Sequence, residues 1–324
     1  MVSCKYFFTN VIKIVKCNLS YTLAFCYLYL WGNITQIMTF EAIQNEITGG
    51  FGWVWKQITF QVDWNDNYFW FLTVLSIAVW GLELAFPWRK NQKAIRRNFW
   101  LDAFYMYFNF FIFASVISGL YKLINIYSPL TTEDFAILNL TALAPWMALL
   151  IFFIMNDFVQ WFTHVVLHRF EFLWNFHKVH HSVKEMGFAA HLRYHWVENL
   201  VYKPLKTLVV LLIIGGEPND AFIIHFISIA IGHLNHANVK ITWGPLKYVF
   251  NNSVMHLWHH VKALPEDRRH GVNFGISLSL WDYIFKTNYI PHESGDIELG
   301  FDNDEKFPID NFGKQLIYPI GKED

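Results

Sequence analysis

The feature that most constrains this chain is a repeated cluster of histidines. The pattern H-x-x-H-H occurs twice in 324 residues that include 15 histidines, and at that frequency it should arise by chance only about 0.03 times. On a helix, positions i, i+3 and i+4 share one face, so each copy is expected to point three imidazoles at one place. The two copies are His177, His180 and His181, and His256, His259 and His260.

A third group of the same kind precedes the first copy. His164 and His168 are four residues apart, and Asp157 and Gln160 extend the same helical stripe. We expect both histidines to be metal ligands and Asp157 to orient one of their imidazoles. The alternative for this stripe is a polar face between packed helices. For the two triplets, the alternatives are an interfacial histidine patch or a proton relay.

The number of imidazoles favours two metal ions. Two triplets and a pair exceed the four ligands of a tetrahedral zinc site. Iron, zinc, copper and nickel all accept imidazole, so ligand type alone does not choose among them. All three cysteines lie within the first 26 residues, so the rest of the chain offers no disulfide and no thiolate ligand.

Further histidines occur in two later segments. In HFISIAIGHLNHAN, His225, His233 and His236 share one helical face. A histidine in a hydrophobic span is costly unless it is used, so we expect His236 to complete the metal shell. His233 is the next candidate, and His225 is expected to be structural. On spacing alone, His195 in AAHLRYHWVEN is open between ligation and packing.

Composition indicates a membrane protein. Hydrophobic residues make up 54% of the chain and aromatic residues 19%, an excess over ordinary soluble domains. The formal net charge of −1 and the lack of a basic tract argue against nucleic acid as a partner. We expect an all-α polytopic fold with about four transmembrane helices, one pair being a candidate re-entrant hairpin. A cytosolic helical domain that carries the histidines and two metals should cap these helices.

Charge-free runs give the expected spans. A split hydrophobic region is interpreted as a hairpin, which is tolerated where its turn is buried in protein. The basic loop from Arg89 to Arg97 is cytoplasmic by the positive-inside rule, and this places the histidine clusters on the cytoplasmic side. The spans are Asn67–Leu82, extended at the interface by Glu83–Trp88, then Ala103–Tyr121 and Phe135–Asn156, and the split region is Leu205–Gly216 with Ala221–Val239.

The chain divides into four parts on this basis. Residues 1–38 form an N-terminal hydrophobic extension, either a signal-anchor or an artefact of start-site choice. Residues 39–140 hold membrane helices and the basic loop. Residues 141–290 form the catalytic histidine domain with the membrane hairpin, and residues 291–324 form a cytosolic C-terminal tail.

These segments resemble the fatty acid hydroxylase/sterol desaturase superfamily of membrane di-iron oxygenases. DFVQWFTHVVLH resembles the family helix D-x-x-x-Y-W-x-H-R-x-x-H, and HKVHHS and HLWHH match its other histidine boxes. RYHWVEN resembles R-F-H-P-x-E, which supports His195 as a ligand and draws attention to Glu198. In that segment, Trp196 replaces the family's proline.

Two further segments carry the resemblance to residues around the ligands. HANVKITWGPL resembles H-S-N-x-x-x-x-x-G-P-L, which supports His236 as a ligand and Asn238 beside it. NFGISLSLWDYIFKT resembles the sequel N-F-G…W-D-x-x-F-G-T, with Lys286 in place of glycine. The match implies that Asn273 and Asp282 lie next to the metal ligands and hold them in place without binding the metal themselves.

The resemblance implies a function as well as a fold. It implies two iron ions, with zinc as a substitute in a purified sample, and dioxygen as co-substrate. The reaction is oxygen insertion into, or hydrogen removal from, an unactivated C–H bond of a bilayer lipid, and the choice between these stays open. The chain has no G-x-G-x-x-G after a strand, no cysteine cluster and no haem domain. We therefore expect a separate ferredoxin- or cytochrome-type electron donor, and a location in the bacterial inner membrane or the endoplasmic reticulum.

Other classes remain as alternatives. A membrane haem protein could use paired histidines, although adjacent H-H doublets are not needed for that. A metal transporter would distribute histidines across the spans, and a zinc hydrolase would be expected to carry H-E-x-x-H, which is absent. The main alternative is thus a metal- or haem-binding membrane protein that lacks oxygenase activity, either an electron carrier or a transporter.

Overall fold

The structure is a computed structural model, which describes residues 40–112, 140, 143–199 and 218–320. Within these residues the regular structure is helical, with two isolated β-bridges and no strand. The all-α prediction is confirmed for this part of the chain. The predicted N-terminal extension, residues 113–121 of the second span and the segment Leu205–Gly216 lie outside the described residues.

Helix length varies from 25 residues in α6 (Pro145–Arg169) to five in α11 (Leu280–Ile284). Residues 99–112 are also helical. Short 3₁₀ turns connect several elements, among them η2 (Phe188–Leu192). The α-helices are α2 (Phe40–Ile58), α3 (Tyr68–Ala85), α6 (Pro145–Arg169), α7 (Glu171–His181), α9 (Pro218–His236), α10 (Ser253–His259), α11 (Leu280–Ile284) and α12 (Phe312–Ile317).

In the described part, α3 and α6 are long and apolar enough to cross a membrane. The side chain of Asn67 caps α3 by accepting from the backbone N–H of Trp70 at 3.2 Å, and Pro145 occupies the first turn of α6. α3 agrees with the predicted first span. The predicted third span was placed too early, because α6 begins at Pro145 and continues beyond Asn156 to Arg169. The count of four spans stays a prediction.

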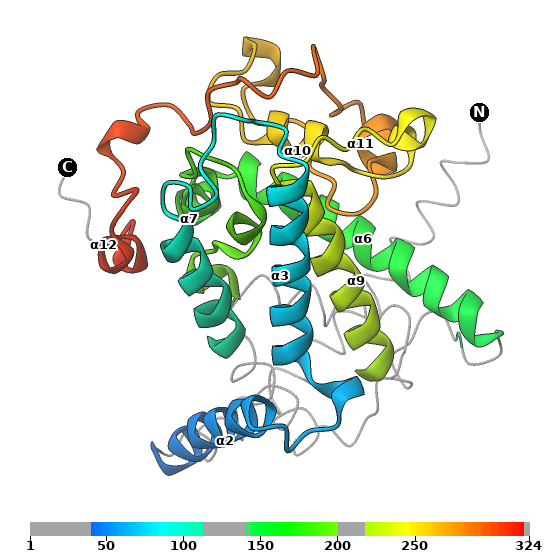
Figure 1. Cartoon of the computed structure of the whole chain (residues 1–324), viewed down its shortest axis with the longest axis vertical. Coiled ribbons are helices and arrows are strands. Elements are labelled where there is room, and N and C mark those ends of the chain that lie inside the picture. The colour runs from blue at the N-terminus through cyan, green and yellow to red at the C-terminus, as the bar shows by residue number, and fades with distance from the viewer. Residues whose placement is uncertain (1–39, 113–139, 141–142, 200–217, 321–324) are drawn as a thin grey trace, which may run out of the picture.

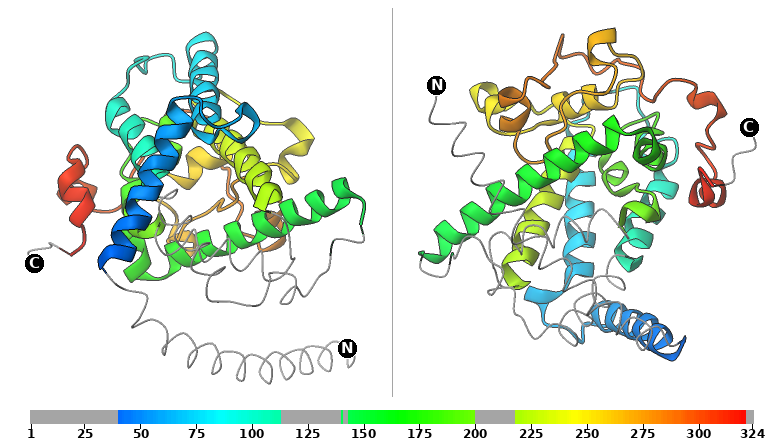
Figure 2. Two further views of the ribbon diagram at one scale, coloured as in Figure 1. Left: turned by 90° about the horizontal axis from the view of Figure 1, so that it is seen from below. Right: turned by 180° about the vertical axis from the view of Figure 1, so that it is seen from behind.

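The long helices form a bundle beneath the short ones. α3 and α9 lie side by side, and α6 crosses the bundle and contacts α9 and α7. α2 lies across the end of α3 that is remote from α10 and α11 (Figures 1 and 2). The elements that carry histidines therefore meet at one end of the bundle.

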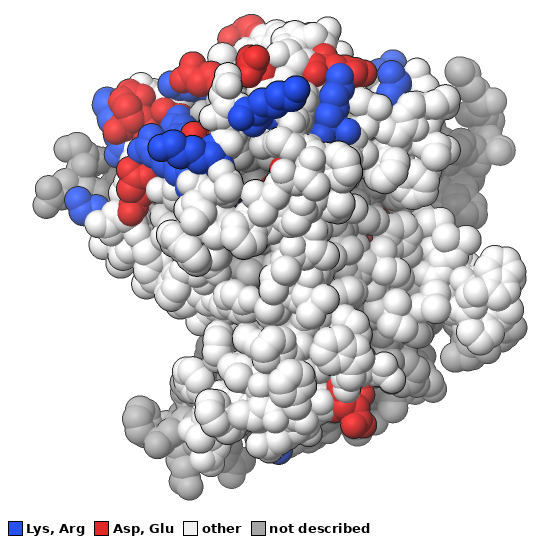
Figure 3. Space-filling view, viewed as in Figure 1, with Lys and Arg blue, Asp and Glu red and all other residues white. Residues whose placement is uncertain are grey.

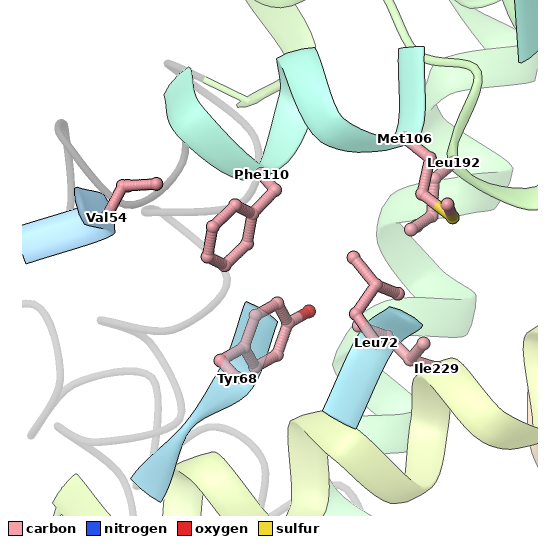
Figure 4. Packing of buried hydrophobic residues seen from close by; sticks show 7 residues of the cluster. All are labelled: Val54, Tyr68, Leu72, Met106, Phe110, Leu192 and Ile229. Atoms are coloured by element: carbon pink, nitrogen blue, oxygen red, sulfur yellow. The ribbon is translucent and has the colours of Figure 1, made fainter. Parts of the chain in front are cut away.

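A hydrophobic cluster fills the bundle between α2, α3, α9 and the helical residues 99–112. Tyr68 stacks on Phe110 with ring centroids 5.1 Å apart, and Leu72, Met106 and Ile229 pack beside them (Figure 4). These side chains are buried, and burial of a large apolar side chain contributes about 1.5–3 kcal/mol. The cluster holds the helices at the distance from one another that the histidine site requires.

Charge is distributed unevenly over the molecule. On the face shown in Figure 3, Lys, Arg, Asp and Glu gather at the end that carries α10 and α11, and the helical body is almost free of them. On the helical body, Ile77 and Leu150 are 62% and 50% exposed. An apolar outer surface is expected for a body immersed in lipid, with the charged end in water.

A buried ion-pair network at the charged end joins segments that are far apart in the sequence. Asp102 accepts from Arg96 Nη2 at 2.6 Å and from Arg193 Nη1 at 2.9 Å, and all three side chains are buried. Arg193 also donates to the carbonyl of Ile309 at 2.7 Å, and the backbone N–H of Gly300 donates to the carbonyl of His260. Residues of the predicted C-terminal tail thus pack against the histidine-bearing segments.

Candidate metal centre

Nine of the ten predicted ligands gather in two groups. In each group the candidate ligand atoms lie within 4.8 Å of one another. Eight of the nine side chains are buried, and His168 is partly exposed. The first group is His164, His168, His177, His181 and His259, and the second is His180, His236, His256 and His260.

Each H-x-x-H-H triplet is divided between the two groups. On α7, His177 and His181 belong to the first group and His180 to the second. The second triplet, on α10 and its C-terminal cap, is divided the other way. His259 belongs to the first group, and His256 and His260 belong to the second. The expectation that a triplet points at one place is thereby corrected. Successive residues are about 100° apart around a helix, so adjacent imidazoles diverge while those at i and i+4 converge.

The two groups touch each other. The ring of His181, in the first group, stacks on the ring of His260, in the second, with centroids 4.4 Å apart and an interplanar angle of 25°. His256, in the second group, and His259, in the first, are also close, with centroids 5.1 Å apart. The arrangement is therefore one continuous site with two centres.

Hydrogen bonds in the first group leave two lone pairs facing each other. His164 Nδ1 lies 2.8 Å from the carbonyl oxygen of Phe274, which can only accept, so Nδ1 carries the proton. His177 Nδ1 in the same way faces the carboxylate of Glu198 at 3.0 Å. The Nε2 atoms of the two histidines then carry lone pairs, and they are 3.2 Å apart. Two facing lone pairs repel each other unless a proton or a metal ion lies between them.

The second group has the same geometry. His236 Nδ1 donates to the carbonyl of Gly232 at 2.7 Å, and its Nε2 lies 3.0 Å from Nε2 of His256 and 3.4 Å from Nε2 of His180. The Nε2 atoms of His256 and His260 are 3.2 Å apart. Two nitrogens bound to one ion at about 2.1 Å and about 90–110° apart would be separated by about 3.0–3.4 Å. The observed spacings match those of ligands that share an ion.

The remaining ring nitrogens also fit metal binding. Burial, and after it the neighbouring imidazoles, hold the pKa of four of these side chains well below the ordinary histidine value: His180, His181, His256 and His260. The neutral imidazole is the form that binds metals. In the first group, Nε2 of His168, His181 and His259 is buried and has no hydrogen-bond partner among the described residues, so these three atoms are free to bind an ion. An all-imidazole donor set without thiolate suits two borderline ions such as iron or zinc.

Sequence reasoning missed several groups that support the ligands. Glu198 is the one carboxylate in the described part that is hydrogen-bonded to a grouped histidine. The resemblance to the family drew attention to Glu198, but no local pattern connects it to its partner His177 on another element. His259 Nδ1 donates to the carbonyl of Val272 at 2.7 Å, and backbone carbonyls of this kind have no signature in a sequence.

His195 and His233 lie outside both groups. His195 Nε2 is 3.1 Å from the carbonyl of Leu316, and its Nδ1 accepts from a backbone N–H at 3.2 Å. His233 is 3.2 Å from the hydroxyl of Ser76 and 2.9 Å from Nδ1 of His191. The structure brings neither side chain to a candidate metal position, and we therefore omit His195 from the ligand set.

Among the described residues Asp157 is hydrogen-bonded to backbone and indole donors and to no imidazole, unlike the role expected for it. Its carboxylate accepts from the backbone N–H groups of Ser277 and Leu278 at 3.1 and 3.2 Å, and from the indole of Trp281 at 3.0 Å. It thereby joins α6 to the segment that leads into α11. The segment runs next to the histidines, so Asp157 acts on the site through the backbone.

Asp282 has the closest connection to a ligand among the predicted supporting residues. Its carboxylate accepts from the indole of Trp161 at 3.1 Å and from the backbone N–H groups of Phe274 and Gly275 at 2.9 and 2.8 Å. The carbonyl of Phe274 is the acceptor for His164. Asp282 therefore fixes the orientation of the His164 imidazole indirectly, through the backbone of Phe274.

The two predicted asparagines shape the backbone around the site. Asn238 accepts from the backbone N–H of Arg89 at 2.9 Å. Asn273 has a positive φ of 51°, and its side chain donates to the carbonyls of Met255 and Tyr289 at 2.9 and 2.7 Å. In the described residues, neither amide is hydrogen-bonded to an imidazole, so both contribute by holding loops against α10 and α3.

Comparison with known proteins agrees with this site. Residues 149–287 match the model of the family described as fatty acid hydroxylase, and this range contains both histidine groups. The histidine-bearing part of the chain thus matches the fatty acid hydroxylase family, which confirms the resemblance seen in the sequence.

Two characterised relatives are similar to part of the chain. It is 30% identical over 148 residues to ornithine lipid hydroxylase OlsE of Rhizobium tropici, covering 45% of this chain and 43% of that protein. It is 26% identical over 160 residues to alkylglycerol monooxygenase of Caenorhabditis elegans, covering 48% of this chain and 29% of that protein. The chain therefore spans less than half the length of each of these relatives. No solved structure matches the chain.

Proposed function

We propose that this protein is a membrane-bound oxygenase that hydroxylates an unactivated C–H bond of a lipid, with two iron ions held by the nine grouped histidines. The observation that carries the proposal is the pair of groups in which imidazole lone pairs face one another at 3.0–3.4 Å. Buried lone pairs that face one another at this distance repel unless a proton or a metal ion joins them, and a metal ion can join several nitrogens at once.

Bound iron would supply the activation of dioxygen, which acid–base side chains cannot provide for a C–H bond. Other residues of the chain keep a nitrogen of several ligands available for the iron. The carboxylate of Glu198 and the carbonyls of Phe274, Gly232 and Val272 each receive an Nδ1–H and leave Nε2 available. Burial of eight of the nine histidines keeps water from the site.

Hydroxylation is favoured over desaturation. One relative is named a hydroxylase and the other a monooxygenase, and both act, by their names, on lipids. An apolar helical body with two helices of membrane-spanning length supports a substrate that reaches the site from the bilayer. The particular lipid, the cytoplasmic side of the site and the separate ferredoxin- or cytochrome-type electron donor remain predictions from the sequence.

The test is incorporation of isotopically labelled dioxygen. Purified, iron-loaded protein in lipid nanodiscs is given a reducing system and a lipid extract from the source membrane, and the lipids are analysed by mass spectrometry. We expect a lipid that gains one labelled oxygen atom. A product that loses two hydrogens instead would indicate desaturation. Bound metal without dioxygen consumption would favour a metal carrier, and a Soret band in the purified protein would favour a haem protein.

Variants connect the activity to the site. His181→Ala and His259→Ala each remove a nitrogen of the first group, so we expect loss of bound metal and of product together. His270→Ala changes an exposed histidine outside both groups and serves as the control that keeps both. Full turnover by either of the first two variants would contradict the proposal.

A further inference from the structure

The reaction proposed above needs two electrons from outside the chain, and this inference rests on that function. The histidines that would hold iron are buried, with only His168 partly exposed. An electron carrier therefore cannot touch the metals, and electrons have to cross a layer of protein. Transfer across such a layer slows exponentially with the width of non-bonded gaps, so a conjugated ring that touches the ligands is the favoured entry point.

Trp174 has the contacts that such an entry point needs. It lies on α7, three residues before His177, and its indole is partly exposed. Its ring centroid is 4.8 Å from that of His168, 5.1 Å from that of His181 and 6.1 Å from that of His177. A single side chain thus touches three of the five histidines in the first group.

Trp174 also contacts aromatic rings that connect it to the charged end of the protein. Its ring contacts Phe301 at 6.0 Å, and Phe301 contacts Phe307 at 5.5 Å. Phe307 lines a cleft of about 700 Å³ whose other walls include Lys184 and Asp304. This side of the indole therefore faces the polar end, where a water-soluble carrier can approach.

Other aromatic rings near the site do not have this combination. Phe274 contacts the first group but is buried. Tyr194 is partly exposed and stacks on His180 at 5.0 Å, but it packs against the hydrophobic cluster inside the helical body. Trp258 lies between two grouped histidines in the sequence, yet its described ring contacts are with Tyr289 and His292.

We propose that Trp174 is the residue through which electrons enter the first histidine group from an external one-electron carrier protein. In each step the reduced carrier loses one electron, which would tunnel through the indole and reduce an iron held by the first group from ferric to ferrous. Two such transfers supply the reducing equivalents for one turnover. Trp174 is unchanged at the end, no bond to it forms or breaks, and it releases no proton.

The experiment measures reduction of bound iron in the absence of dioxygen. Iron-loaded ferric protein is mixed in a stopped-flow instrument with dithionite, which dissociates to an anionic one-electron reductant that approaches from water. The loss of ferric absorbance is followed for wild type, Trp174→Phe, Trp174→Leu and the control Trp258→Leu. Iron content and thermal unfolding are measured on the same samples, so each rate is expressed per bound iron.

We expect Trp174→Leu to reduce about tenfold more slowly than wild type, equivalent to about 1.4 kcal/mol in the barrier, with its iron content retained. Trp174→Phe should be slowed less, and Trp258→Leu should match the wild type. If the leucine variant loses iron, the phenylalanine variant decides, because it keeps an aromatic ring in the same packing.

A wild-type rate in a Trp174 variant that keeps its iron would overturn the inference. The same holds if Trp258→Leu is slowed as much as the Trp174 variants. Failure of the proposed function is a separate result, seen when wild-type protein binds no iron or gives no labelled lipid. Electron entry can thus be refuted while lipid hydroxylation stands.

Discussion

The carboxylate of Glu198 offers the sharpest test of how the site is held. Its Oε2 is 3.0 Å from Nδ1 of His177, and both side chains are only 3% exposed. The contact fixes the tautomer in which Nε2 of His177 is free to bind a metal. Replacing the acid by its amide keeps the shape and removes the charge, so Glu198→Gln isolates the electrostatic part of the support.

The size of the effect follows from the kind of hydrogen bond. A buried hydrogen bond to a charged group contributes about 1.5–3 kcal/mol, and a neutral one about 0.5–1.5 kcal/mol. Glu198→Gln should therefore lose about 1 kcal/mol, which weakens metal binding roughly five- to tenfold. Glu198→Ala removes the partner altogether, and loss of such a support typically costs about 10–100-fold in metal affinity.

The assay is competition for the metal. Protein loaded with Co²⁺ is titrated with a chelator of known affinity, and the visible absorbance of the bound ion reports occupancy. Glu171→Gln is the control, because Glu171 is an exposed acid on the same helix as His177. We expect the order of affinity to be wild type and Glu171→Gln, then Glu198→Gln, then Glu198→Ala. Equal affinities in all four proteins would refute the role given to this carboxylate.

Four other expectations can be checked with purified protein. Asp102→Asn removes a carboxylate that pairs with two buried guanidinium groups, so it should cost about 3–5 kcal/mol; thermal unfolding in detergent measures this, and an unchanged midpoint contradicts it. Gly232→Ala would bring a Cβ within 2.3 Å of the ring of His191, and overpacking of this kind costs about 1–3 kcal/mol; the same scans should show a lower midpoint, and wild-type stability would count against the close contact. His195→Ala should keep the full metal content in elemental analysis, and a loss would return His195 to the ligand set. Chelation should lower the unfolding midpoint, since metal at 100 times its Kd stabilises by about 2.7 kcal/mol; Fe²⁺ or Zn²⁺ should restore it and Mg²⁺ should not, because hard cations prefer oxygen ligands.

The sequence predicted the histidines that gather in the two groups because their spacing follows directly from helix geometry. His164 and His168, one turn apart on α6, do converge. His195 was different, because a short segment such as RYHWVEN does not determine which way a ring points. The ring turned towards the backbone of Leu316, a residue 121 positions away. Contacts of that range depend on tertiary packing, which a local pattern cannot report.

Supporting groups were harder to predict than ligands for the same reason. Asp157 lies on the same stripe as His164, but its nearest partners turned out to be the backbone of Ser277 and Leu278. A carboxylate binds whichever donors fold against it, and here those donors come from a segment 120 residues later. The helical stripe from Asp157 to His168 was predicted, and it lies on α6, which continues to Arg169.

The division of each triplet has a consequence for how the two centres assemble. α7 and α10 each contribute to both groups, so neither group can move without moving the other. The stacked rings of His181 and His260 lie at their shared boundary. Because metal binding and folding are linked, the first ion should order α7 and α10 and thereby pre-form the second site. Two centres built on shared helices are therefore expected to fill cooperatively, whereas two centres on separate helices would fill independently.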